Sequence, residues 1–210
     1  MAEVTPTRSE AIALAEERRT MQEGYAFLDE KCLLLAGEML RQLREHRRLA
    51  AVLAPLQAQA RGRLNAALAR HGLHGLQVAP ATPSAQTVSV TRHPLLGVPM
   101  LAASLNGEAP VPPTAVNASP ELEACRKACA QLAAPLVQLA AISNNLARLY
   151  AEYRRTVRRV RALQDVLLPE VERTLAEVET GLAELEQDEQ AMLRRAALGR
   201  DTPDGANGDP

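Results

Sequence analysis

The chain has 210 residues and 47% hydrophobic content, but it contains only one Phe, three Tyr and no Trp. Because so few large side chains cannot fill a rounded core, the composition argues against an ordinary globular domain and favours paired helices rich in Ala and Leu. The formal net charge of -1 gives no overall attraction to nucleic acid or to an anionic membrane surface.

The first long helix is expected to begin near Arg8, within an N-terminal segment of residues 1–76. Thr7 or Ser9 can accept a backbone N–H bond at its start, and Gly72 can adopt the left-handed conformation at its end. Positions spaced by three and four residues predict a face that packs against a second helix. These positions are Leu14, Arg18, Met21, Tyr25, Leu28, Cys32, Leu35, Met39, Leu43, His46, Ala50 and Leu53.

Three features of this helix predict departures from a regular coiled coil. The successive steps of four from Leu35 to Met39 to Leu43 predict a stutter that locally unwinds a left-handed supercoil. Pro55 is expected to kink or interrupt the helix. Gly24 either weakens the helix slightly or allows a close approach of the partner helix.

The middle segment, residues 77–120, holds eight of the fourteen prolines, so no long helix is expected there. Within it, the alternating stretch Thr87–Thr91 is followed by Arg92–Val98, a pattern that favours a short β-hairpin. Residues 108–119 resemble a proline-rich linker.

The second long helix is predicted over residues 121–198, with Ser119 as its cap and Pro120 at its first position. Pro135 and Pro169 fall inside it and predict curvature. Residues 199–210 are expected to be a disordered tail. The positions expected to face the first helix are Cys125, Cys129, Leu132, Leu136, Leu139, Ser143, Leu146, Tyr150, Tyr153, Val157, Val160, Leu163, Leu167, Val171, Leu175, Val178, Leu182 and Leu185.

No catalytic, cofactor or metal site is expected from the sequence. It lacks the G-x-x-x-x-G-K-[ST] phosphate-binding loop. A zinc site can be imagined from Cys125 and Cys129 with His71 and His74, but cysteines on a packing face are usually small buried hydrophobes. The odd cysteine count, the polar N-terminus and the lack of a long apolar run predict free thiols and a cytoplasmic protein that meets a membrane only through partners.

Clusters of arginine are the candidate partner-binding residues. If the long helices pair in antiparallel fashion, both clusters are expected at one level, where they would need an acidic collar of partner protein. A solvated face is the simpler alternative, and nucleic acid is disfavoured because few aromatic side chains are present for stacking. The residues are Arg44, Arg47 and Arg48 on the first helix, and Arg154, Arg155, Arg158 and Arg159 on the second.

A specific motif surrounds the second cluster. The residues Glu152-Tyr153-Arg154-Arg155-Thr156, Arg158-Arg159-Val160, Ala162-Leu163, Val166 and Pro169 precede a Glu-rich helix. Near the N-terminus stand Thr5-Pro6-Thr7-Arg8-Ser9-Glu10, Gly24, Phe27-Leu28, Lys31 and Leu35. Together they resemble the D subunit of the vacuolar and archaeal-type rotary ATPases.

The resemblance implies the central rotor shaft of a V/A-type ATP synthase or ATPase, a non-catalytic component peripheral to the membrane. The implied partners are the catalytic A and B subunits, the small F subunit of the rotor and a funnel-shaped protein above the membrane ring. The predicted fold is all-α: two long antiparallel helices in a left-handed coiled coil, with a short irregular or β-hairpin region at the turn. A free-standing coiled-coil scaffold or adaptor is the alternative, because helix periodicity alone would suffice for it.

Overall fold

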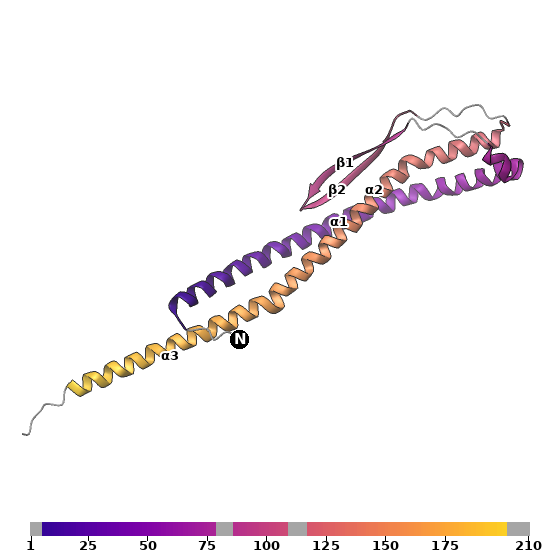
Figure 1. Ribbon diagram of the computed structural model, residues 1–210. Coiled ribbons are helices and arrows are strands. Elements are labelled where there is room, and N and C mark those ends of the chain that lie inside the picture. The colour runs from indigo at the N-terminus through magenta and orange to yellow at the C-terminus, as the bar shows by residue number, and fades with distance from the viewer. Residues whose placement is uncertain (1–5, 79–85, 109–116, 201–210) are drawn as a thin grey trace, which may run out of the picture. The chain divides into compact units, whose positions relative to one another are not determined.

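The computed structural model describes residues 6–78, 86–108 and 117–200 (Figure 1). A long helix α1 (Arg8–Gln77) is followed by strands β1 (Thr87–Leu95) and β2 (Val98–Asn106). Helix α2 (Pro120–Ala162), a π-helical turn η1 (Leu163–Leu167) and helix α3 (Leu168–Arg200) then form one continuous helical run. The predicted all-α hairpin with a short β-hairpin is therefore confirmed. Of the expected tail, residues 199 and 200 belong to α3, and residues 201–210 lie outside the described residues.

Local hydrogen bonds explain where the helices begin and end. Thr7 accepts from the backbone N–H of Glu10 at 3.2 Å at the start of α1, and Ser119 accepts from that of Leu122 at 3.1 Å at the start of α2. Gly72 has φ 69° and ψ 172°, so α1 leaves helical geometry at the glycine that was expected to end it, but this is not the left-handed helical cap predicted there, and the helix then continues to Gln77. The side chain of His71 also bonds to the Ser119 hydroxyl at 2.6 Å, which ties the two helix ends together.

The prolines do not break the helices. Gly72 is the one residue of α1 with non-helical φ/ψ, so of the kink or interruption predicted at Pro55, the interruption is wrong. Pro135 likewise lies inside α2. Directly before Pro169, the N–H of Leu168 bonds to the carbonyl of Leu163, five residues back. A proline lacks a donor and crowds the preceding turn, and this wider π-turn provides the adjustment there.

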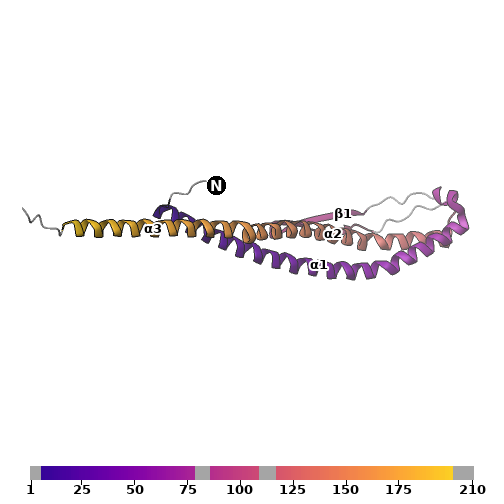
Figure 2. The ribbon, with the colours of Figure 1, turned by 90° about the horizontal axis from the view of Figure 1, so that it is seen from below.

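The chain divides into two compact units, of which one comprises Lys31–Thr156. Its core is small: Leu35 of α1 and Leu149 of α2 pack with Val98 and Met100 of β2. The two-stranded antiparallel hairpin therefore lies along the α1–α2 pair (Figures 1 and 2). Its closed end reaches the level of Leu35, roughly 55 Å along α1 from Gly72 at 1.5 Å per residue.

The hairpin changes which face of α1 is buried. Gln42 and Leu49 are buried, continuing the heptad spacing from Leu35, whereas Leu43 is only half-buried. The predicted stutter through Leu43 is therefore wrong. The polar Gln42 can occupy the buried position because its amide nitrogen donates to Glu38 at 2.8 Å.

A similar shift occurs on α2. Leu136, Ser143 and Tyr150 were expected to face α1, but all three are exposed. Cys125 and Val160 are buried as predicted, and the other buried positions of α2 are Leu122, Ala128, Ala141, Asn145, Leu149 and Thr156. The helix is rotated toward the hairpin because Leu149 supplies part of the core on which β2 packs.

Side chains of α2 complete the outer edge of β2. The Asn145 amide accepts from the Leu101 N–H and donates to the Leu101 carbonyl, both at 2.8 Å. One turn further along α2, Arg148 donates to the Pro99 carbonyl at 2.7 Å. Alternate residues of a strand direct their backbone groups to the same edge, so helix α2 takes the place of a third strand.

The hairpin turn is strained at one residue. Leu96 and Gly97 connect the paired residues Leu95 and Val98, with φ 51° and 84°. Two consecutive positive φ values are typical of a type I′ turn, in which Asn-Gly is preferred. A leucine in this conformation costs about 1–2 kcal/mol.

The other unit comprises Met1–Glu30 and Val157–Pro210. Arg8 and Glu186 form an ion pair at 2.7 Å, and Val160, Val171, Leu175 and Val178 are buried, as the helical spacing predicts. The close approach considered for Gly24 is absent, since an added Cβ would meet nothing within 4 Å. Among the described residues, no helix is long and apolar enough to cross a membrane.

Replacing Leu96 by Asn is expected to stabilise the hairpin by about 0.5–1 kcal/mol, because Asn tolerates positive φ better than Leu. The increase in hairpin stability would be measured as slower hydrogen exchange of the β1 and β2 backbone amides. Gly97→Ala is the opposite control and should accelerate exchange, since φ 84° strains a side chain. Equal exchange in both variants would contradict the assignment of strain to this turn.

Replacing Asn145 by Ala is expected to destabilise hairpin docking by about 1–3 kcal/mol, because two backbone groups of Leu101 lose their partner. Hydrogen exchange at Leu101 and thermal unfolding would measure the loss. Asn144→Ala is a matched control, since Asn144 is the same residue type, adjacent and exposed. If both variants behave alike, the amide bridge contributes nothing to docking.

Candidate partner-binding surface

The arginines predicted to meet a partner lie on two helices, and all of them are exposed. Arg44, Arg47 and Arg48 lie on α1. Arg154, Arg155, Arg158 and Arg159 lie on the last turns of α2, directly before the π-turn. Each helix therefore presents a local cluster of positive charge to its surroundings.

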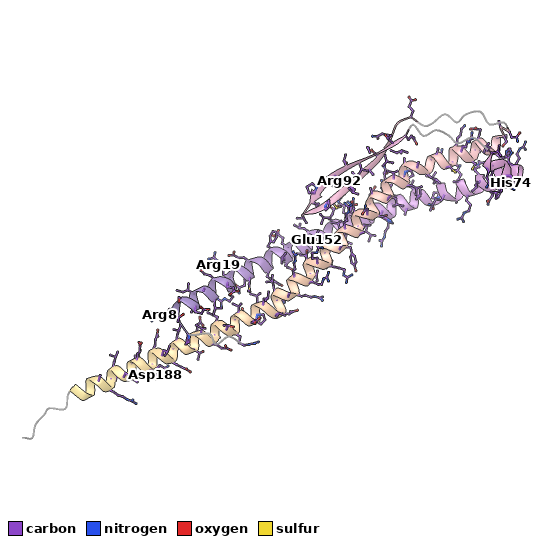
Figure 3. All side chains as sticks on the ribbon, viewed as in Figure 1. Arg8, Arg19, His74, Arg92, Glu152 and Asp188 are labelled. Carbon is purple, nitrogen blue, oxygen red and sulfur yellow. The ribbon has the colours of Figure 1, made fainter. Side chains whose placement is uncertain are left out.

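The pairing of α1 with α2 shows that these clusters are not at one level. Lys31 and Glu152 form an ion pair at 2.8 Å, with side chains only 18% and 19% exposed. Arg154 and Arg155 follow Glu152, which is labelled in Figure 3, within one helical turn, so they lie near the level of Lys31. A cavity further along the unit is lined by Gln42 and Glu45 of α1 and, from α2, by Gln138, Ala141 and Ile142.

The α1 cluster thus lies opposite residues near 140 of α2, roughly 20 Å along the helix from Arg154 at 1.5 Å per residue. The predicted single level is wrong. The tight packing of Leu35 with Leu149, which the hairpin covers, fixes a different pairing of the two helices from the one that the arginine positions suggested.

Local carboxylates partly neutralise the cluster on α1. Arg48 bonds to Glu45 at 2.6 Å, and this hydrogen bond lowers the pKa of Glu45 and raises that of Arg48. Arg41 makes a bidentate contact with Glu38, and the same hydrogen bonding lowers the pKa of Glu38. Both carboxylates therefore stay ionised near neutral pH.

Arg44 and Arg47 differ from their neighbours. Neither forms an ion pair within residues 6–78, 86–108 and 117–200, and both follow apolar residues of α1 by one turn. Their charge is therefore directed outward, where a partner could meet it.

The cluster on α2 is held by contacts of a different kind. The Arg154 guanidinium lies 5.7 Å from the centroid of the Tyr150 ring, a cation–π geometry. Arg155 contacts Glu152 at 3.3 Å, so that carboxylate is shared with Lys31. The Thr156 hydroxyl donates to the Glu152 carbonyl and is buried. The residues at the start of the arginine motif therefore contribute to the pairing of α2 with α1 as well as to the exposed positive surface.

Some residues that position this surface were not identified from the sequence. Asn145 and Arg148 hold the hairpin, and Met100 fills the core. The sequence offers one indication of the role of Asn145. It is one of two consecutive asparagines inside a long helix, and Asn is a poor helix former. The cavity of about 350 Å³ near Gln42 is also lined by His93 of β1. No pattern in the sequence indicates that His93 lies near Gln42.

The cysteine pair shows no metal-binding arrangement. Cys125 is buried and Cys129 exposed, and burial, followed by the neighbouring Cys129, raises the pKa of the Cys125 thiol. His71 is engaged with Ser119. Across the described part of the chain, no group of three or more His, Cys, Asp or Glu residues could hold a metal ion.

Comparisons with known proteins agree over nearly the whole chain. Residues 10–197 match the family of the ATP synthase D subunit. The V-type ATP synthase D subunit of Thermotoga neapolitana is 24% identical over 194 residues, covering 91% of this chain and 96% of that protein. The A-type ATP synthase D subunit of Thermococcus sibiricus is 26% identical over 197 residues, covering 91% of this chain and 92% of that protein. The A-type ATP synthase D subunit of Methanopyrus kandleri is 27% identical over 197 residues, covering 92% of this chain and 85% of that protein.

Proposed function

Since this chain belongs to the ATP synthase D-subunit family, we propose that it is the central-stalk rotor of a V/A-type ATP synthase or ATPase. In this role it transmits torque between the catalytic hexamer of A and B subunits and the ion-translocating ring in the membrane. It carries no nucleotide site of its own, consistent with a sequence that lacks the phosphate-binding loop.

The observation that carries the proposal is the long course of both helical stretches. α1 keeps helical geometry from Arg8 to the kink at Gly72, and α2, η1 and α3 follow one another without a gap despite Pro135 and Pro169. A shaft that transmits torque must resist twisting, and continuous backbone hydrogen bonding along paired helices provides that resistance.

Contacts within each unit support the same role. The Lys31–Glu152 ion pair and the Leu35–Leu149 packing join α1 to α2 in one unit, and the Arg8–Glu186 pair joins α1 to α3 in the other. Cross-links of this kind between antiparallel helices oppose sliding of one helix past the other. They suit a protein that acts mechanically.

The exposed arginine clusters are proposed to meet the catalytic subunits. A rotor passes several equivalent stator positions, so a diffuse attraction that varies little with angle serves better than deep, directional salt bridges. Exposed ion pairs contribute only about 0–1 kcal/mol each, which fits that requirement. Because the clusters lie at different levels, they would meet the stator as two bands, with Arg44 in one and Arg154 in the other.

The remaining partners follow from the same assignment. We place the small F subunit of the rotor on the side of the shaft and the funnel-shaped protein between the shaft and the membrane ring. The chain is then a cytoplasmic component, peripheral to the membrane and attached to it only through that assembly.

Reconstitution tests the rotor role. Adding the full chain to A and B subunits should yield a closed hexamer that retains a single copy of the chain. A bead attached to the chain should turn in one direction when ATP is supplied and stop when a non-hydrolysable analogue replaces it. Binding without rotation would indicate a static scaffold, and failure to bind the hexamer would contradict the rotor role.

Charge removal tests the two bands. Arg158→Gln with Arg159→Gln, and separately Arg44→Gln with Arg47→Gln, should each weaken hexamer affinity about 3- to 30-fold at low salt, from about 0.3–1 kcal/mol per lost charge. Surface plasmon resonance over a salt series measures this, and the variants should lose part of the salt dependence.

Arg61→Gln with Arg63→Gln is the matched control, because both residues are exposed on α1 and lie outside the clusters. It removes the same charge and should leave affinity unchanged. If all three double variants bind alike, the arginine clusters are only a solvated face.

A further inference from the structure

Two thiols lie one helical turn apart near the start of α2. Cys125 is buried and Cys129 is exposed. Burial raises the pKa of the Cys125 thiol, and the electrostatic interaction and hydrogen bond with the Cys129 thiol raise it further. The two side chains are therefore in contact, with Cys129 open to solutes and Cys125 held behind it as a protonated thiol.

Only these two of the three cysteines can pair within one chain. Cys32 adjoins Lys31, which bonds to Glu152 of α2 at 2.8 Å. At 1.5 Å per residue, Glu152 lies roughly 40 Å along α2 from Cys125. Cys32 is thus out of reach, and the only possible disulfide within the chain joins Cys125 to Cys129.

A disulfide between these residues does not fit a regular helix. Side chains four residues apart on a helix have Cβ atoms about 5–6 Å apart, whereas a disulfide holds them about 3.5–4.5 Å apart. Forming the bond would therefore pull residues 125–129 out of helical geometry, and it would disturb the packing of Ala128, which is buried between them. A strained disulfide is easily reduced again, as regulatory disulfides are.

The turn of α2 just before these cysteines joins the end of α1 to the start of α2 (Figure 1). His71 bonds to the Ser119 hydroxyl at 2.6 Å, and Arg70 forms an ion pair with Glu121 at 3.4 Å. We call these two contacts the end clasp. Residues 125–129 begin one turn after Glu121, so their distortion would displace this end of α2 against α1 and open the clasp.

We propose that Cys125 and Cys129 form a reversible thiol–disulfide switch that opens the end clasp when a peroxide oxidises it. The switch belongs to the chain itself and does not depend on the rotor role. It suits a reducing compartment, where the pair is held as thiols until an oxidant appears.

The chemistry runs in two steps. The Cys129 thiolate attacks one oxygen of hydrogen peroxide, and the O–O bond breaks to leave a sulfenic acid on Cys129 and a hydroxide, which takes up the proton that Cys129 had lost. The Cys125 sulfur then attacks the Cys129 sulfur, and its proton leaves with the sulfenic oxygen as water. Two thiols have lost two electrons, and the peroxide has become two water molecules. Two molecules of glutathione supply the electrons and protons that restore the thiols.

Peptide mapping detects the bond in the full chain. Arg126 and Lys127 lie between the cysteines, so trypsin places Cys125 and Cys129 in separate peptides. After treatment with hydrogen peroxide and blocking of the remaining free thiols, the two peptides should be recovered as one disulfide-linked pair. Excess reduced glutathione, added before digestion, should separate them.

Hydrogen exchange shows whether the bond opens the clasp. Backbone amides of residues 119–130 should exchange at least about tenfold faster in the oxidised chain than in the reduced chain, because their helical hydrogen bonds are distorted. Amides around Leu149, which lie far along α2, should exchange at the same rate in both forms.

Variants assign the two roles. Cys129→Ser should prevent oxidation at both positions and, as an exposed substitution, should leave the circular dichroism unchanged. Cys125→Ala should stop the reaction at a sulfenic acid on Cys129, which dimedone traps. Cys32→Ala is the matched control, since Cys32 is another buried helical cysteine of the same unit, and it should behave like the unmodified chain.

Three outcomes would overturn the proposal. Peroxide that leaves both thiols free, or that joins two chains through Cys129, would show that no internal bond forms. A linked pair with unchanged exchange in residues 119–130 would be a disulfide without effect on the clasp. A linked pair that glutathione fails to reduce would be a permanent cross-link.

Discussion

The contact of Leu35 with Leu149, covered by Val98 and Met100 of the hairpin, is the packing on which the unit Lys31–Thr156 depends. A chain with so few aromatic residues has little else from which to build a core. This contact also fixes which turn of α1 faces which turn of α2 at this level of the unit. The Lys31–Glu152 ion pair beside it is mostly buried and opposes a shifted pairing, because a shift would separate the buried Lys31 from its carboxylate.

The hairpin is a structural part of the helix pair because two side chains of α2 replace a third strand. A two-stranded hairpin is marginally stable in water, and its free edges invite pairing with other chains. Asn145 satisfies both backbone groups of Leu101, and Arg148 satisfies the carbonyl of Pro99. The outer edge of β2 is thereby closed by a helix, and the hairpin is held in one register on the α1–α2 pair.

Docking of the hairpin also determines the surface. Because α1 and α2 turn their Gln42 and Asn145 faces toward it, the neighbouring apolar faces around Leu40 and Tyr150 remain exposed. The Leu35–Leu149 contact in the same core sets which turns of the two helices face each other, so Arg44 and Arg154 lie at different levels. Docking of the hairpin thus leaves apolar side chains exposed, and the packing beneath it separates these two arginines along the unit.

The sequence by itself determined the local structure and the family. Helical spacing, the caps at Thr7 and Ser119 and the alternating stretch around Val90 depend on neighbours within a few residues, and the motif beginning at Glu152 is contiguous. Only the tertiary structure decided how α1 pairs with α2, why Gln42 is buried and where the arginine clusters lie. Those features depend on the hairpin, which contacts residues far away in the sequence, and helical periodicity specifies an apolar face without specifying what covers it.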